Sequence, residues 1–257
     1  MKFLQSLAAQ VSLRTQGAIL ALGILFILLD LITEPMHPVI DLAWVTVIVC
    51  GLPLLINSVN SIWDNLEIHA NFLVVIAMVA LIAIGDYHTA AYVGIIVHAG
   101  FFLEQLITGD AHYTLDDDML PAMPAQLVAL RQGINNYSSV IVVAVMLLSM
   151  GSFALTQDFV HTVTLLLVLC PCSLELILVA LMMGSLVDNN SPVSELSKGA
   201  KQSHLGLLIV SILFHVAIIG TGVLGLIDPV TAVALHGLAR LGLVYNLKVL
   251  DGSLCVA

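Results

Sequence analysis

Eight continuous apolar runs, each close to the length needed to cross a lipid bilayer, constrain this chain more than any other feature of its sequence. The hydrocarbon core of a bilayer is about 30 Å thick and takes roughly 20 residues of α-helix. The runs span residues 17–33, 41–57, 70–85, 88–107, 137–156, 160–187, 204–225 and 229–250. Membrane-spanning β-strands are shorter and alternate polar with apolar residues, which these runs do not. The sequence therefore predicts an all-α fold, a polytopic membrane protein of eight transmembrane helices in a single domain.

The low charge content excludes a water-soluble fold. Of the 257 residues, 60% are hydrophobic and 9% are charged, whereas soluble domains carry about 25% charged residues. The seven Lys and Arg residues are scattered, so they offer no basic face for the phosphates of a nucleic acid. We therefore expect the lipid bilayer as a partner and no nucleic acid.

The distribution of cations predicts the topology. No Lys or Arg lies in the turns that follow the first, third, fifth and seventh runs. Six of the seven cations lie in the other segments, namely Lys2, Arg14, Arg131, Lys198, Lys201 and Lys248. Because Lys and Arg favour the cytoplasmic side of a membrane, both termini are predicted to be cytoplasmic. The two longer connections, 108–136 and 188–203, are then short cytoplasmic loops.

The sixth run contains the motif Cys170-Pro171-Cys172. Proline has no N–H and clashes with the carbonyl four residues earlier, so we expect the helix to break at Pro171. Such a break would let both thiols face one cavity. Thiolates prefer soft cations such as Cu(I) and Zn(II), which makes Cys170 and Cys172 candidate metal ligands. The alternative is a proline kink flanked by two thiols that are buried for packing.

Charged and polar side chains inside membrane helices are costly, so each is a candidate for a role. Glu175 follows Cys172 by three residues on the same helix face. It is a candidate oxygen ligand, proton carrier or partner of Arg240, and a Glu175–Arg240 pair would satisfy both intramembrane charges. The further polar candidates are His98, Glu104 and His215. For the histidines, a hydrogen bond to a neighbouring helix is the alternative to a ligand role.

Five segments follow one another in an order that resembles a transporter family. They are residues 83–105, 165–174 (LLLVLCPCSL), 201–203 (Lys-Gln-Ser), 235–237 (Leu-His-Gly) and 244–250. Together they resemble the membrane domain of heavy-metal-transporting P-type ATPases, a family with eight membrane helices and a Cys-Pro-Cys motif in the sixth. The resemblance covers nearly all of the predicted membrane helices and implies a P-type metal ATPase-like membrane domain.

The resemblance also implies a soft-metal site. The implied ligands of Cu or Zn are Cys170, Cys172 and His236. Ser211 stands where family members carry Asn or Lys. Arg240 is an added cation that would repel a metal ion unless Glu175 neutralises it.

The soluble domains of that family have no counterpart in this chain. Family members phosphorylate an aspartate in an Asp-Lys-Thr-Gly-Thr motif between helices six and seven, where this chain has only residues 188–203 without the motif. The place of the actuator domain, between helices four and five, holds only residues 108–136. The resemblance therefore implies a motorless scaffold that uses no ATP and is not an enzyme.

Two functions follow from this comparison. The first is a structural or accessory subunit of a membrane assembly, with other membrane protein subunits as partners, which suits the absence of the motor domains and the added charges. The second is a passive pseudo-pump that binds or conducts Cu or Zn at Cys170-Pro171-Cys172. A proton relay through Glu175 and the intramembrane histidines is a third interpretation, and removal of the soluble domains by engineering is a fourth.

Overall fold

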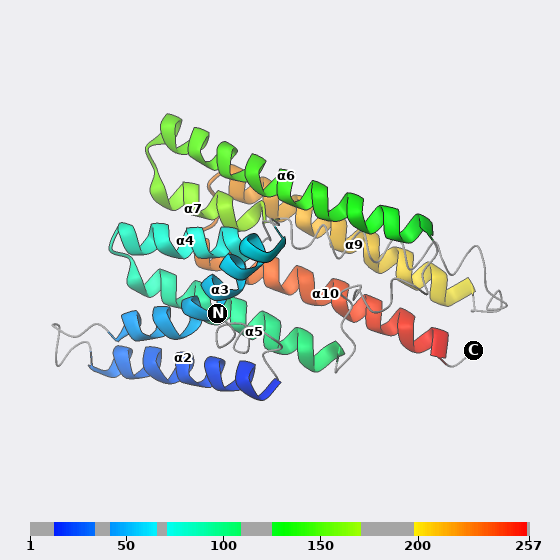
Figure 1. The fold of residues 1–257 in the computed structure, drawn as a ribbon, viewed down its shortest axis with the longest axis horizontal. Coiled ribbons are helices and arrows are strands. Elements are labelled where there is room, and N and C mark those ends of the chain that lie inside the picture. Colours follow the sequence, from blue (N-terminus) through cyan, green and yellow to red (C-terminus); the bar gives the residue numbers. More distant parts are fainter. Residues whose placement is uncertain (1–12, 34–41, 66–70, 109–124, 171–197, 256–257) are drawn as a thin grey trace.

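The computed structural model describes residues 13–33, 42–65, 71–108, 125–170 and 198–255, and these ranges are almost entirely α-helical (Figure 1). The helices are α2 (Leu13–Thr33), α3 (Ala43–Asn65), α4 (Asn71–Ala83), α5 (Tyr87–Thr108), α6 (Ala125–Thr156), α7 (Phe159–Val168), α9 (Lys198–Val223) and α10 (Pro229–Cys255). The prediction of an all-α fold is confirmed for the described residues.

Successive helices run in opposite directions, so alternate turns lie at the same end of the molecule. The last turns of α2, α4, α6 and α9 meet the first turns of α3, α5, α7 and α10 on the left of Figure 1. We call this the aspartate end, after Asp30, Asp86, Asp158 and Asp228. The described cation-free turns, those after α4, α6 and α9, therefore lie at the same end as the last turn of α2, as their predicted common side requires.

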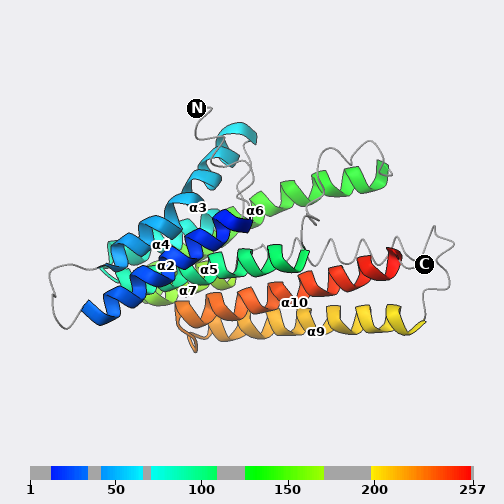
Figure 2. The same cartoon turned by 90° about the horizontal axis from the view of Figure 1, so that it is seen from below.

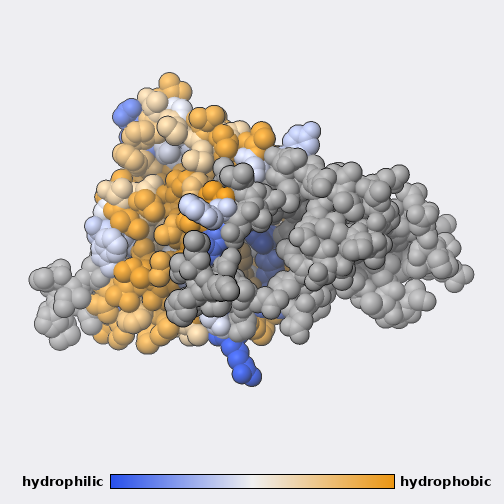
Figure 3. Space-filling view, viewed as in Figure 1, coloured by the Kyte–Doolittle hydropathy of each residue, from blue (hydrophilic) through white to orange (hydrophobic). Residues whose placement is uncertain are grey.

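Five of the described helices are long and apolar enough to cross a membrane. The spans are Leu13–Ile32, Ala43–Asn60, Tyr87–Ile107, Ser139–Thr156 and Leu205–Val223. Large apolar side chains such as Leu31, Val140 and Leu213 are exposed on their outer faces, and hydrophobic residues dominate the described surface in Figure 3. Helices satisfy their own backbone hydrogen bonds, as the bilayer core demands. The chain is an integral membrane protein.

Several helices extend beyond the predicted apolar runs. α6 begins at Ala125 and α9 at Lys198, so residues 125–136 and 198–203 are helical where loops were predicted. α3 likewise continues to Asn65. The prediction was wrong there because it followed apolarity alone, whereas Ala, Gln, Leu and Arg form helix well outside a membrane. Helix ends are set by backbone propensity and capping, not by bilayer thickness.

Close helix packing surrounds Cys50 of α3. A Cβ atom added at Gly23 of α2 would lie 2.9 Å from Cys50 Sγ, and one added at Gly94 of α5 would lie 2.9 Å from Cys50 Cβ. Small residues let helix backbones approach closely, which is the main source of helix association in lipid. Gly23 and Gly94 therefore hold α2, α3 and α5 together, while α3 leans away from the other helices in Figure 2.

Replacing Gly94 with alanine is expected to destabilise the protein by about 1–3 kcal/mol, because the new methyl group overpacks the contact with Cys50. Gly100 on the same helix is the matched control, since nothing lies within 4 Å of a Cβ built there. Equilibrium unfolding in mixed micelles measures both variants. Equal stability of Gly94→Ala and Gly100→Ala would contradict the close packing.

Aspartates begin three of the helices at the aspartate end. Backbone N–H groups of Thr89 and His161 donate to Asp86 and Asp158 at 3.0 and 3.1 Å. The third is Asp228, whose pKa is held below its ordinary value by hydrogen bonds, chiefly from the Thr231 side chain. An N-cap carboxylate satisfies helix N–H groups that have no partner within the helix. The caps fix where the chain turns back into the membrane.

Asp158→Ala is expected to cost about 1 kcal/mol of unfolding free energy through loss of the α7 cap. Asp158→Asn keeps an acceptor oxygen and serves as the control. The same micelle unfolding assay compares the two variants. If both lose equal stability, the carboxylate contributes by charge and not as a cap.

Candidate functional site

An ion pair joins α5 to α10. Arg240 Nη2 lies 3.0 Å from Glu104 Oε2 and donates to Oε1 at 3.3 Å. Each side chain is about a quarter exposed, at 24% and 23%. The Arg240 guanidinium carbon also lies 5.5 Å from the centre of the Phe101 ring, within the range of a cation–π contact. Each charge therefore has a counter-charge within contact distance, and the aromatic face adds to the attraction.

A small cavity adjoins this ion pair between α4, α5, α7 and α10. Its volume is about 50 Å³, enough for a water molecule or a single ion. The wall includes Cys170, which follows α7, and His236 and Arg240 on successive turns of α10. Gly100 and Gly237 leave room on the two facing helices. A thiol, an imidazole and a guanidinium thus share one small space.

His236 is backed by a second histidine. The rings of His236 on α10 and His215 on α9 meet edge to face, with centroids 5.6 Å apart. His215 Nδ1 donates to the backbone carbonyl of Ser211 at 2.8 Å, so Ser211 orients this ring through its main chain. With Nδ1 bearing the proton, the neutral ring presents Nε2 as an acceptor. A ring contact between His215 and His236 therefore joins the two helices, and the Ser211 carbonyl on α9 orients the His215 ring.

His98 lies apart from this cavity. Its Nε2 donates to the Cys50 carbonyl at 2.8 Å, and its Nδ1 lies 3.3 Å from Gln16 Oε1. It lines a second, neighbouring cavity of about 190 Å³ with Gln16, Asn57 and Asn71. The alternative of a hydrogen bond to neighbouring helices is confirmed for His98, because its contacts tie α5 to α2 and α3.

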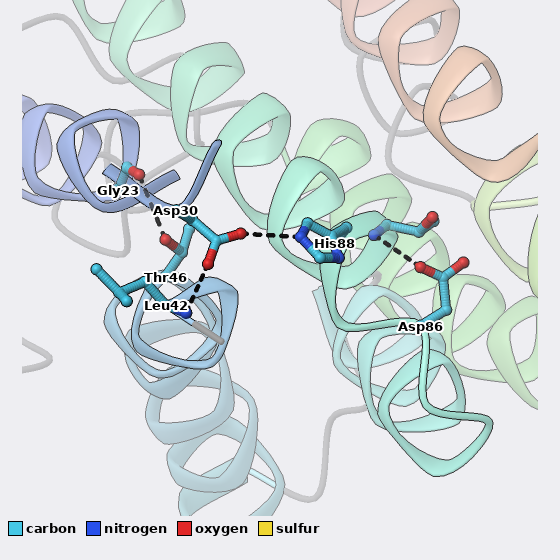
Figure 4. Close-up of polar contacts among 7 residues, drawn as sticks. Gly23, Asp30, Leu42, Thr46, Asp86 and His88 are labelled. Carbon is cyan, nitrogen blue, oxygen red and sulfur yellow. Dashed lines mark hydrogen bonds and ion pairs between the residues drawn. The ribbon is translucent and has the colours of Figure 1, made fainter. Parts of the chain in front are cut away.

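A buried carboxylate at the aspartate end was not singled out from the sequence. Asp30 is only 3% exposed, and it accepts hydrogen bonds from Leu42 N at 2.6 Å and His88 Nε2 at 2.8 Å (Figure 4). A buried charge needs such partners. The signal was the lone acidic residue in the first apolar run. The two hydrogen bonds therefore connect the end of α2 with the beginnings of α3 and α5.

The structure brings part of the implied metal site together. Cys170 and His236 line one cavity, whereas Pro171, Cys172 and Glu175 lie outside the described residues. α7 ends at Val168, and Cys170 is non-helical, as residues before a proline tend to be. Within the described ranges, no group of three His, Cys, Asp or Glu side chains could hold a metal ion.

The residues present fit a metal poorly, because the Arg240 guanidinium lines the same cavity as the two donors. Its partner in the described structure is Glu104, a contact that the sequence reasoning missed. The predicted Glu175–Arg240 pair stays a prediction. Glu104 and Arg240 are 136 positions apart, so no spacing rule predicts their contact from the sequence.

Comparisons with protein-family profiles, with curated proteins and with solved structures found no match for this chain. The resemblance to heavy-metal P-type ATPases stays a proposal that rests on the sequence segments named above.

A double-mutant cycle tests the ion pair. Arg240→Met and Glu104→Gln are each expected to cost about 1–3 kcal/mol, because each leaves one charge without its partner. The double variant is expected to cost less than the sum of the two, with a coupling energy of about 1 kcal/mol or more. Unfolding in mixed micelles measures all four proteins. Strict additivity would show that the contact contributes no stability.

Proposed function

We propose that this chain is a structural or accessory subunit of a larger membrane assembly, built on a motorless scaffold that resembles the membrane domain of heavy-metal P-type ATPases. One observation carries the proposal: Arg240 and Glu104 neutralise each other beside the cavity of Cys170 and His236. A cation pathway needs uncompensated ligands, whereas an ion pair between helices stabilises their packing. The polar residues of this region therefore suit a role in holding helices together.

The proposed topology has eight spans with both termini in the cytoplasm. Besides the five long apolar helices, it includes α4, α10 and the apolar run 160–187, of which α7 forms the first part, as spans. α4 and α7 are short, and six of the 13 residues of α4 and six of the ten of α7 are buried in the core, where protein and not lipid surrounds them. α10 carries Arg240 toward Glu104, so its charge is matched inside the bundle. These features support counting all three as spans.

Other membrane proteins are the proposed partners. The helices expose long apolar faces, which lipid or a neighbouring subunit can cover equally well. The chain has no soluble motor of the P-type kind in the segments where that family carries one, so neither ATP nor an enzymatic reaction enters the proposal. Its role is to position partners in the bilayer.

A second candidate is passive binding or conduction of Cu or Zn. The shared cavity of Cys170 and His236 favours it, since thiol and imidazole donors suit these metals. The guanidinium of Arg240 in the same wall opposes it. We therefore rank this candidate below the structural role.

Purification from native membranes in a mild detergent tests the structural role. The tagged chain is expected to bring other membrane proteins with it at a reproducible ratio, as measured by mass spectrometry. An unrelated polytopic membrane protein with the same tag is the control for carry-over. A partner-free, monodisperse particle from the native membrane would count against the proposal.

A further inference from the structure

The cavity between α5, α7 and α10 combines metal-binding donors with a fixed positive charge. Cys170 and His236 offer a thiol and an imidazole, and Arg240 lies one turn after His236 on the same helix face. The guanidinium is held in place twice, by Glu104 at 3.0 Å and by the Phe101 ring at 5.5 Å. Moving the guanidinium out of the cavity wall would therefore break both contacts.

The geometry points to Arg240 as a tethered cation that keeps soft metal ions out of this cavity. Cys170 and His236 then provide metal-binding donors, but the positive charge of Arg240 repels a metal ion from them. The resemblance to metal pumps implies that these donors bind a metal ion. The proposal differs, because the donors are present but Arg240 prevents binding. It also holds whether or not the chain is a subunit of an assembly.

Two physical effects exclude the metal. Arg240 lines the cavity and Glu104 does not. Compared with a neutral side chain at position 240, a unit positive charge a few ångströms from a bound cation weakens binding on the order of 100-fold at an effective dielectric constant of about 20, and a divalent ion is repelled more strongly. In addition, the negative charge of Glu104 is engaged by Arg240, whose Nη2 contacts both carboxylate oxygens, so less of that charge acts on a metal ion. Removal of the Arg240 charge cancels both effects at once and frees a carboxylate next to the cavity.

Cadmium binding to the purified chain in micelles is the test, because Cd²⁺ accepts thiolate and imidazole ligands and its thiolate complexes absorb in the ultraviolet. The wild-type chain is expected to bind Cd²⁺ at this cavity at least about 100-fold more weakly than Arg240→Met. Arg240→Lys keeps the positive charge and is the matched control, so it should resemble the wild type. Cys170→Ser in the Arg240→Met background should abolish the gained binding.

Arg240→Met removes the counter-charge of Glu104 and can therefore impair folding. A second variant makes the test independent of this effect. Arg240→Met with Glu104→Gln removes both charges and is expected to gain Cd²⁺ binding as well, while Glu104→Gln alone, which retains the guanidinium, is not. Size-exclusion profiles and unfolding midpoints report folding of each protein.

Three outcomes overturn the proposal: wild-type binding as tight as that of the charge-removed variants, no gain in either of these variants, or a gain that survives Cys170→Ser. The first would favour the pseudo-pump. None of them bears on whether partner proteins co-purify, so failure here and failure of the proposed structural role are distinguishable.

Discussion

A lipid bilayer offers no hydrogen-bond partner to a polar side chain, and this constraint accounts for the polar contacts of the bundle. Glu104 and Arg240 pair with each other, and His98 bonds to the Cys50 carbonyl. These two contacts cross from one helix to another, whereas His215 finds its partner in the Ser211 carbonyl of its own helix. The few polar groups therefore determine which helices are neighbours.

α5 is the helix on which most of these contacts converge. Along its length, Gly94 admits Cys50, His98 bonds α3, and Glu104 pairs with α10. His88 at its first turn bonds Asp30 of α2. Apolar packing alone gives little preference for one helix pair over another in lipid, whereas a close approach at glycine and a polar contact are specific. α5 thus sets the arrangement of α2, α3 and α10 around it.

The helices of this chain could be predicted from sequence more completely than their contacts. Apolar runs predict where helices lie, because apolarity is a local property of the sequence. The extension of α6 back to Ala125 was missed since it is polar helix outside the apolar run. The Arg240–Glu104 pair was missed for another reason: helix rotation and neighbour identity are set by the whole bundle, and no spacing rule reaches across it.

The Arg240–Glu104 ion pair bears on both proposals, the structural role of the chain and the exclusion of metal from the cavity. A metal site gains affinity from negative charge that is not yet compensated, but here the carboxylate of Glu104 is matched by a guanidinium that also stacks on Phe101. That arrangement lowers the cost of keeping both charges among apolar helices, which is the benefit to stability. It also places a positive charge beside Cys170 and His236, which is the obstacle to a cation. A helix bundle can therefore retain thiol and imidazole donors without binding a metal ion, because the positive charge of one neighbouring side chain, Arg240, opposes binding.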